Sequence, residues 1–504
     1  MSLFSRFKKQ QPVEGKNSTE PVYLGAQFQE QMGWLKNALK QCSDVHFHHL
    51  TTNGIRLGIV YLQGMIDQAL FEETILKPIL ADGFASSKAE FFYKLLDLKQ
   101  ISAMSSTVQT DMSKAVQSVL DGNVLVVVDG ESRMLAFPVM SFDKRAVSEP
   151  ANENVIRGPR ESFVEDISTN LTLIRRRIKT PSLKMEQLLV GKLTQTKVVI
   201  SYIEGVCKQE LIDEVKQCLS QIQMDAILDS SYLEECIEDH PFSPFPQIEK
   251  TERPDVAAAA LLQGRVVIFV DGTPIPIIMP VNFYMFLQSA EDYYQRYFSA
   301  SWIRWIRMAF LLTSLIFPSV YIAVTTFHPE MIPTSLLISV ASARDNVPFP
   351  AFVEAFMMEM AFEGLREAGI RTPKAIGQAI SILGALVIGQ AAVQAGIISA
   401  PMVIIVSLTG IANFIIPHYD LAFTIRFLRF PVMFLAASFG IFGLTVGMLL
   451  IYIHMVSLRS FGMPYLAPTA PLRVQNLKDV FIRAPWWTLN QSASHRSFSE
   501  GEED

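Results

Sequence analysis

The stretch Gly122-Asn-Val-Leu-Val-Val-Val-Asp-Gly130 recurs further along the chain as Gly264-Arg-Val-Val-Ile-Phe-Val-Asp-Gly272. In both copies a run of aliphatic residues ends in Asp-Gly, a dipeptide that supplies the positive φ angles of a tight hairpin turn. An earlier segment, LGIVYLQG at 57–64, recurs in the same order as VVISYIEG at 198–205. The offsets are 141 residues (57 to 198) and 142 residues (122 to 264), which indicates an internal repeat.

The repeat predicts two lobes of similar α/β (α+β) fold. Each copy reads as a strand, a glycine turn, helices and a β-hairpin. We expect a flexible tail over 1–35, a first lobe over 36–155, a connector helix over 156–180 and a second lobe over 181–295. A ligand of this soluble part is expected at the interface that the two lobes share.

The connector has the pattern of an amphipathic helix, with acidic residues in its early turns and arginines in its late turns, as the helix dipole favours. Asn170 falls on its apolar stripe, where an amide needs a polar partner. The stripe is compatible with a plain connector; the amide points to a specific contact between lobes or between subunits. The residues assigned to assembly or signal coupling are Arg160, Glu161, Asp166, Asn170, Arg175 and Arg177.

The C-terminal half has the composition of a membrane domain. Of all 504 residues 50% are hydrophobic and only 18% are charged, and the stretch 375–456 contains just three charged residues, Asp420, Arg426 and Arg429. Such a stretch must face lipid or protein. We therefore predict an α-helical multi-span membrane domain over 296–458, followed by a tail over 459–504 whose acidic end is disordered.

Four apolar stretches are long enough, or nearly so, to span a bilayer. They are 302–327, 375–395, 400–416 and 431–456. Arginines and tryptophans at the start of the first stretch place the N-terminal lobes in the cytoplasm by the positive-inside rule. A fifth span over 351–371 would put the tail outside the cell; if this segment only dips into the membrane, the tail is cytoplasmic, which we expect.

The segment 351–371 follows Val347-Pro-Phe-Pro350, which breaks a helix, and it carries four glutamates. In one interpretation it is a helix lying on the membrane surface, with Glu363 and Glu367 paired to Arg366 or Arg371. In the other it forms an acidic wall of a cation path, because charges at membrane depth need water or a partner. The candidates for the ion path are Glu354, Glu359, Glu363 and the amide residue Asn413.

Several classes of function find no support in the sequence. A net charge of -6 argues against a nucleic-acid partner. The four cysteines form no CxxC pair, and the histidines at 46, 48 and 49 are expected in a solvated loop without a metal. No phosphate-binding loop, HExxH or GxSxG motif is present. We expect no catalytic residues, no cofactor and no enzyme activity.

A set of short motifs is similar to signatures of the GerA-type A subunits of spore germinant receptors. The resemblance covers about 30–485, and its motifs include Arg157-Gly-Pro-Arg-Glu161, Glu252-Arg-Pro-Asp255, Asp271-Gly-Thr-Pro274, Val347-Pro-Phe-Pro350 and Ile416-Pro-His-Tyr-Asp420. It implies a subunit in the inner membrane of a dormant spore that responds to small nutrients and assembles with a transporter-like B subunit and a C lipoprotein. It further implies that several copies form a nutrient-gated channel, in contact with lipid, that releases monovalent cations.

Two other functions stay open at the level of sequence. One is that of a sporulation-specific membrane paralogue of the A subunits, with a structural or signal-amplifying role. The other is a secondary transporter, although transporters usually carry inverted repeats within the membrane block, and the repeat here lies in the soluble part.

Overall fold

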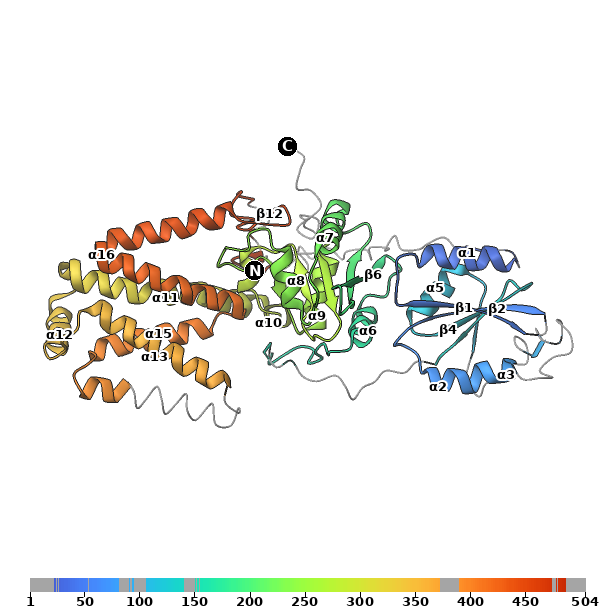
Figure 1. Ribbon diagram of the computed structural model, residues 1–504, viewed down its shortest axis with the longest axis horizontal. Coiled ribbons are helices and arrows are strands. Elements are labelled where there is room, and N and C mark those ends of the chain that lie inside the picture. Colours follow the sequence, from blue (N-terminus) through green and yellow to red (C-terminus); the bar gives the residue numbers. More distant parts are fainter. Residues whose placement is uncertain are drawn as a thin grey trace, which may run out of the picture.

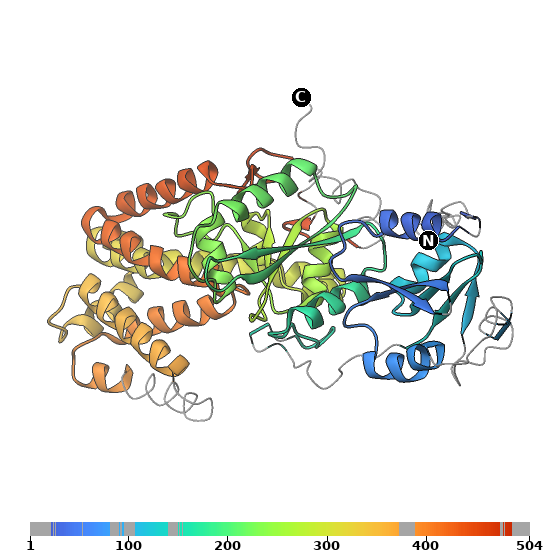
Figure 2. The ribbon, with the colours of Figure 1, turned by 45° about the vertical axis from the view of Figure 1, so that its right-hand side comes forward.

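The computed structural model describes residues 22–23, 25, 27–52, 54–80, 90, 93–94, 106–139, 150, 152–153, 155–371, 389–473, 477 and 479–485. The molecule is elongated, with one lobe at one end, a second lobe in the centre and a bundle of long helices at the other end (Figures 1 and 2). The predicted combination of an α/β N-terminal part and a helical C-terminal part is therefore present.

Lobe 1 is a five-stranded antiparallel sheet between two layers of helix. Its strands are, in spatial order, β1 (Val45–Thr52), β2 (Ile55–Leu62), β4 (Val124–Val128), β5 (Met134–Phe137) and β3 (Thr107–Gln109). Helices α1 (Phe28–Ala38) and α5 (Met112–Leu120) pack on one face. The other face is covered by α2 (Gln68–Phe71), the π-helical turn η1 (Glu72–Leu76) and α3 (Lys77–Leu80).

Lobe 2 is built in the same way. Its strands are, in spatial order, β6 (Leu183–Val190), β7 (Thr196–Ile203), β9 (Val266–Val270), β10 (Ile277–Met279) and β8 (Glu249–Lys250). Helices α7 (Gln209–Gln221) and α8 (Ser230–Ile237) cover one face of this sheet. The other face carries α6 (Ile167–Arg177), which is the connector, and α9 (Pro254–Leu262).

The two sheets share one strand order, with β1, β2, β4, β5 and β3 in the places of β6, β7, β9, β10 and β8. The predicted hairpins are present: β4 pairs with β5, and β9 pairs with β10. Gly130 and Gly272 occupy equivalent turns and have φ angles of 87° and 88°. Asp-Gly thus marks the same corner of each lobe, as the repeat predicts.

Two expectations for lobe 1 are wrong. Helix α1 begins at Phe28, within the tail that was expected to be flexible, because Phe28, Met32 and Leu35 bury an apolar face against the sheet. The histidines lie on strand β1 and not in a loop, where the rings of His46 and His48 stack on the ring of Tyr61. Among the described residues no cluster of His, Cys, Asp or Glu forms a metal site, and all four cysteines are free.

The C-terminal bundle follows a short linking region. That region contains η3 (Phe283–Leu287) and α10 (Glu291–Tyr294), and the bundle contains α11 (Tyr297–Phe327), η4 (Pro329–Met331), α12 (Thr334–Arg344), α13 (Ala351–Arg371), α15 (Ala400–Phe414) and α16 (Tyr419–Ser457). Two described helices, α11 and α16, are long and apolar enough to cross a membrane, and α15 is apolar but shorter. Most of the predicted span 375–395 lies outside the described residues.

The predicted span 431–456 is not one straight helix. Helix α16 breaks at Gly440, whose φ of 63° is left-handed, and the chain folds back on itself. A Cβ at Gly447 would lie 3.7 Å from Val432, although 15 residues separate them (447 minus 432). In a straight helix that separation would be about 22 Å. The second half of α16 therefore packs antiparallel to the first half.

After α16 the chain returns to lobe 2, on the side of the bundle where the lobes lie (Figure 1). A small hairpin of β11 (Arg459–Ser460) and β12 (Met463–Pro464) makes the contact. Ser460 Oγ donates to the Gln247 carbonyl at 2.8 Å, and the backbone N–H of Phe283 donates to the Tyr465 carbonyl at 2.8 Å. The start of the tail therefore packs against lobe 2.

Candidate functional site

A buried ion pair joins the connector helix α6 to lobe 1. Arg175 Nε donates to Asp44 Oδ2 at 2.7 Å, and its Nη2 donates to Oδ1 at 2.9 Å. The two side chains are only 1% and 5% exposed. A third donor, Nη1, reaches the carbonyl of Leu183 at 3.0 Å. One arginine therefore holds lobe 1, the connector and the first strand of lobe 2 together, which is the inter-lobe contact that was expected of Asn170.

Lobe 1 also extends the sheet of lobe 2. The residues before β1 run beside β6, where Cys42 and Met185 form a parallel bridge. The N–H of Ser43 donates to the Met185 carbonyl at 2.9 Å, and the N–H of Met185 donates to the Gln41 carbonyl at 3.0 Å. Because these backbone bonds flank the pair formed by Arg175 and Asp44, the two lobes meet through one continuous junction.

Asn170 has a different role from the one that the sequence suggested. It is buried, accepts from the Val164 N–H at 2.8 Å and donates to the Val164 carbonyl at 2.6 Å. Its partner is thus the chain just before α6 and not another lobe or subunit. Asp166 caps the same helix: burial alone would raise the pKa of this carboxyl, but hydrogen bonds from Thr169 lower it below its ordinary value. Asn170 and Asp166 fix where the helix starts.

The other residues assigned to assembly or signal coupling lie at the two ends of the connector segment. Glu161 precedes the helix and pairs with Arg177 at 2.6 Å, while Arg160 lies exposed beside it. The motif at 157–161 contacts the motif at 252–255, because Arg253 Nη2 donates to the Pro159 carbonyl at 3.0 Å. The two motifs are therefore parts of one structural unit, although about a hundred residues separate them.

A glycine sets the distance between lobe 1 and the connector. Gly64 has a φ of +80°, and a Cβ there would lie 2.6 Å from Thr172 Oγ1 of α6. We expect Gly64→Ala to destabilise the junction by about 2 kcal/mol, from the left-handed backbone and the close contact together. The matched control is Gly205→Ala, since Gly205 has a φ of +82° but nothing within 4 Å. Hydrogen exchange of the 57–64 and 167–177 amides in the full-length protein measures the effect. An equal loss of protection at these amides in both variants would contradict a role for the close contact of Gly64 with Thr172.

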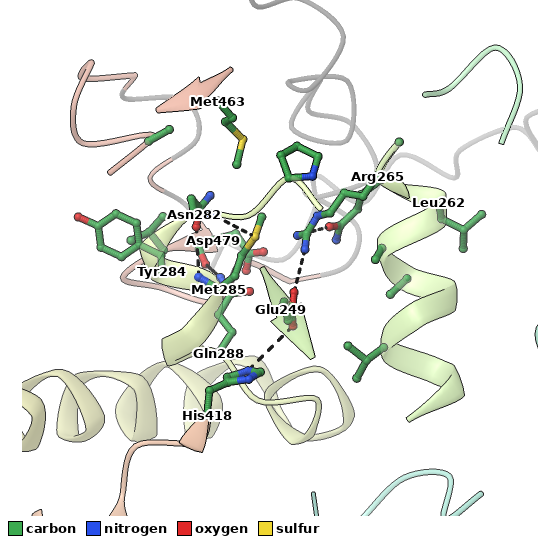
Figure 3. Close-up of a pocket in the computed structure, with 18 of the residues that line it drawn as sticks. Glu249, Leu262, Arg265, Asn282, Tyr284, Met285, Gln288, His418, Met463 and Asp479 are labelled. Carbon is green, nitrogen blue, oxygen red and sulfur yellow. Dashed lines mark hydrogen bonds and ion pairs between the residues drawn. The ribbon is translucent and has the colours of Figure 1, made fainter. Parts of the chain in front are cut away.

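A cavity of about 1180 Å³ lies where lobe 2 meets the linking region and the C-terminal segment (Figure 3). Its walls come from α9, from 280–294 and from 459–480, and its lining residues include Arg265, Asn282, Met285, Gln288 and Met463. This position differs from the expected one, because the sheet and helices of lobe 1 contribute no residue to the lining. Of the expected range 36–155, only Asn152, Glu153 and Val155, which follow the last strand of lobe 1, line the cavity. The linking region, which was expected to be part of the second lobe, and the tail close the cavity against lobe 2.

A chain of ionisable groups crosses the cavity (Figure 3). Arg265 Nη1 lies 3.1 Å from Glu249 Oε2, and the other oxygen of Glu249 lies 4.0 Å from His418 Nε2. Glu249 belongs to β8 of lobe 2, whereas His418 precedes helix α16. The floor of the cavity is thus a direct contact between the soluble part and the helical bundle.

Glu153 makes the stability of this region depend on pH. Burial, together with the charges of Glu249 and Glu252, raises the pKa of Glu153 to about 7. A carboxyl whose folded pKa lies above its ordinary 4.5 favours the protonated folded state, so stability falls as the pH rises from about 5 to about 7. We expect Glu153→Gln to weaken this fall and to stabilise lobe 2 by about 1 to 2 kcal/mol at pH 8. Hydrogen exchange of lobe 2 at pH 5 and pH 8 tests this.

Burial also raises the pKa of Glu238 to about 7, which gives the matched comparison. Glu238→Gln removes a second, separate part of the same pH dependence. The stability of the double variant should therefore change less with pH than the stability of either single variant. An unchanged pH profile in Glu153→Gln would show that its carboxyl titrates normally in the folded protein.

Lobe 2 holds the start of helix α16 through further contacts. Lys250 Nζ lies 3.3 Å from Asp420 Oδ2 and 2.8 Å from Glu234 Oε2. The hydroxyl of Thr424 donates to the carbonyl of Pro244. Because Lys250 follows Glu249 on β8, the same strand contacts both His418 and Asp420 at the entry to α16.

The same helix holds the acidic residues of α13. Arg426 Nη1 lies 3.0 Å from Glu363 Oε2. Arg429, one turn further, pairs with Glu359, and both side chains are 3% exposed. Arg429 Nη2 also donates to Ser314 Oγ of α11 at 3.0 Å. Arg426 and Arg429 are therefore the partners that the sequence did not assign to the glutamates.

The other ion-path candidates lie in the same interior. Glu354 is fully buried, lies 3.3 Å from Arg344 Nε and accepts from the Ser399 N–H at 2.8 Å. Asn413 of α15 is buried, and its Oδ1 accepts from Ser314 Oγ at 3.4 Å. Helices α11, α13, α15 and α16 thus meet in one polar network around Ser314 of α11.

The acidic wall of a cation path stays a prediction, and on the single chain its carboxylates are ion-paired. Each glutamate of α13 has an arginine partner, including Glu367, which lies 2.6 Å from Arg371. The ion-paired alternative correctly placed Glu363 near Arg366, at 3.6 Å, and Glu367 with Arg371. It did not foresee that Glu354 and Glu359 are buried inside the bundle.

Comparison with known proteins decides the family. Residues 33–495 match the family model described as Bacillus/Clostridium GerA spore germination protein. The chain belongs to this family. It is 42% identical over 473 residues to spore germination protein KA of Bacillus subtilis (strain 168), covering 93% of this chain and 86% of that protein. It is 46% identical over 462 residues to the uncharacterized membrane protein YfkQ of the same organism, covering 92% of this chain and 90% of that protein.

Among solved structures, the GerA-family chain is similar to the N-terminal domain of the A subunit of the Bacillus megaterium spore germinant receptor GerK3. The identity is 31%, the match covers 52% of this chain and 98% of that chain, and the TM-score is 0.42. The resemblance to GerA-type proteins that the sequence motifs indicated is confirmed by the family match.

Proposed function

We propose that this GerA-family protein is the A subunit of a nutrient-sensing germinant receptor in the spore inner membrane. It is integral to that membrane, crosses it several times, and keeps its two lobes in the cytoplasm. It acts with a transporter-like B subunit and a C lipoprotein, and several copies surround a gated path for monovalent cations. The observation that carries this proposal is helix α16, which contacts lobe 2 at its start and holds the glutamates of α13 further on.

In this proposal α16 transmits a change in the lobes to the acidic helix. A shift of lobe 2 acts on Asp420 through Lys250, which lies 3.3 Å away. Arg426 and Arg429 lie about two turns further along α16, so the same shift moves them relative to Glu363 and Glu359. Carboxylates released from arginine are able to attract cations, and symmetry repeats them in every copy around the path.

The closed state is held by the energy of these contacts. Separating a buried, hydrogen-bonded ion pair costs about 3 to 5 kcal/mol, because the charge left behind has no solvent. A signal from the partner subunits has to supply this difference between the two states. The network around Ser314 therefore sets a threshold for opening.

Two experiments test the role of A subunit. The first is co-purification of the tagged chain with the B-type and C-type proteins encoded by neighbouring genes, and the expected result is a stable complex. The second is the release of monovalent cations from spores after nutrient addition, with and without this gene. A chain that forms no such complex and does not affect release would match the sporulation paralogue, and saturable flux coupled to a transported solute would match a secondary transporter.

A further inference from the structure

An aromatic patch covers the base of helix α11 and the end of the described chain. Its members are exposed although they are large and apolar: Phe298 (78%), Trp302 (63%), Trp305 (54%), Phe481 (37%) and Ile482 (52%). Such residues are usually covered when they occur together, so the patch has a partner that the described residues of the chain do not supply.

The C-terminal segment is held against α11 by its backbone. Trp305 Nε1–H donates to the Phe481 carbonyl at 2.8 Å, and the N–H of Arg483 donates to Ser301 Oγ at 3.1 Å. The indole donor is thereby satisfied within the chain, so the exposed part of the Trp305 ring is apolar. These bonds align Phe481 and Ile482 with the first turns of α11.

On the opposite side of the same turns of α11, buried ion pairs hold the helix against the linking region. Arg304 and Arg307 are buried, and both pair with Asp292, at 3.1 and 3.0 Å. Arg304 also pairs with Asp479 at 3.1 Å, which ties the C-terminal segment to this cluster. The segment therefore has a side that faces a buried, ion-paired cluster and an apolar side that is exposed.

The position of the patch along α11 identifies what covers it. After Arg307 the helix contains no charged residue over 308–327, which is 20 residues. At 1.5 Å per residue this run is about 30 Å long, the thickness of the hydrocarbon core of a bilayer. Trp302 and Trp305 then lie at the boundary between hydrocarbon and head groups, where amphipathic aromatic rings concentrate. The exposed stripe of Phe298, Trp302 and Trp305 continues at helical spacing to Leu312, inside the charge-free run.

We propose that residues 479–485 lie on the membrane surface and insert Phe481 and Ile482 into the lipid interface, beside Trp302 and Trp305 of α11. The occupant of the patch is phospholipid, at the depth of the glycerol region and the first acyl carbons. This proposal rests on the proposed membrane placement of α11, and it adds that the chain beyond the last helix returns to the same membrane face. The linking region, the buried charge cluster and the membrane surface are thereby joined at one point.

The test uses an environment-sensitive nitrobenzoxadiazole label at single cysteines in the full-length protein. The background carries Cys218→Ser and Cys236→Ser, since these two cysteines are the accessible ones. Ile482→Cys reports on the patch, Leu312→Cys on the spanning face of α11, and Val108→Cys on lobe 1, at the far end of the molecule. The protein is reconstituted in vesicles of equal parts phosphatidylcholine and phosphatidylglycerol, with and without bromine on the upper acyl carbons.

We expect the label at 482 to show blue-shifted emission and severalfold stronger quenching by brominated lipid than the label at 108, which iodide in the buffer should quench instead. A label at 482 that iodide quenches as strongly as at 108 overturns the proposal. Protection from both quenchers at 482 also overturns it, because a protein partner then covers the patch. If brominated lipid does not quench the label at 312, the proposed membrane placement of α11 is wrong. If brominated lipid quenches the label at 312 but not the label at 482, the placement of α11 stands and the proposal for residues 479–485 is wrong.

Discussion

Arg429→Met should destabilise the helical bundle by about 3 to 5 kcal/mol and lower the amount of folded protein in the membrane. The substitution leaves the carboxylate of Glu359 buried without its cation, and it also removes the donor to the Ser314 carbonyl, which lies 2.8 Å from Arg429 Nε. An unpaired buried charge is among the most costly single defects in a folded protein.

The double variant Arg429→Met/Glu359→Leu distinguishes the cost of one unpaired buried charge from the contribution of the ion pair itself. Removing both charges should recover most of the loss, since apolar residues of similar volume often replace a buried pair without cost. The matched control is Arg371→Met, because the pair of Arg371 with Glu367 lies on the surface and should contribute only about 0 to 1 kcal/mol. Midpoints of denaturation of the detergent-solubilised protein measure all three variants. A double variant as unstable as Arg429→Met would contradict a direct role for the pair.

Asp44→Asn should uncouple the lobes, with a loss of about 3 to 5 kcal/mol at their junction. Arg175 would stay buried with its cation unbalanced, and its remaining acceptors are the carbonyls of Thr180 and Leu183. Hydrogen exchange of the amides at 41–45 and 183–185 in the full-length protein measures the loss, because these segments form the backbone bridge between the lobes.

The chain offers a matched control for the junction. Lys179 of the connector region pairs with Asp121 of lobe 1 at 2.8 Å, but this pair is exposed. Lys179→Met removes an ion pair between the same two parts of the molecule and should change exchange little, since solvent screens exposed pairs. If Lys179→Met and Asp44→Asn have equal effects, the burial of the pair formed by Arg175 and Asp44 is not what holds the lobes.

The features that the sequence predicted well are those with local causes. The Asp-Gly turns define hairpins because the dipeptide tolerates left-handed backbone angles, and the repeat places both turns at equivalent corners. The connector helix was also anticipated, although it starts at Ile167 and not earlier, because Asp166 caps it there. Local backbone chemistry and apolar periodicity are readable from one sequence.

The features that were missed depend on contacts between distant residues. Asp44 and Arg175 are 131 residues apart, Glu359 and Arg429 are 70 residues apart, and no local pattern links either pair. The break in α16 was missed because residues on both sides of Gly440 are apolar on all faces, so that the periodicity gives no sign of a turn. The usable signal was the run of glycines at 440, 443 and 447, where close helix packing and a left-handed angle meet.

The cavity was not anticipated, for a similar reason. Two equal lobes suggest a site between them, but here a backbone bridge and a buried ion pair fill that junction. The cavity forms instead where the linking region and the C-terminal segment, which are far apart in sequence, enclose one end of lobe 2. Of the residues named in advance for an ion path, Glu354, Glu359 and Asn413 are buried in the helical core, and Glu363 is partly exposed at its edge. Arg426 and Arg429, which pair with Glu363 and Glu359, stood out in the sequence only as charged residues in an apolar stretch.

The most direct test of the proposed function is cation passage in Glu359→Gln/Glu363→Gln. Glutamine keeps the size of the side chain and one acceptor for Arg429 and Arg426, while the negative charge is lost. Because the substitution leaves the buried cation of Arg429 unbalanced, cation release is compared per amount of assembled receptor. We expect nutrient-triggered cation release from spores, and the cation-over-anion selectivity of the reconstituted receptor, to fall clearly in this variant. Glu367→Gln serves as the control, since its exposed carboxylate already pairs with Arg371. A double variant that assembles normally, with flux and selectivity equal to the unmodified receptor, would contradict the proposal that these glutamates control an ion path.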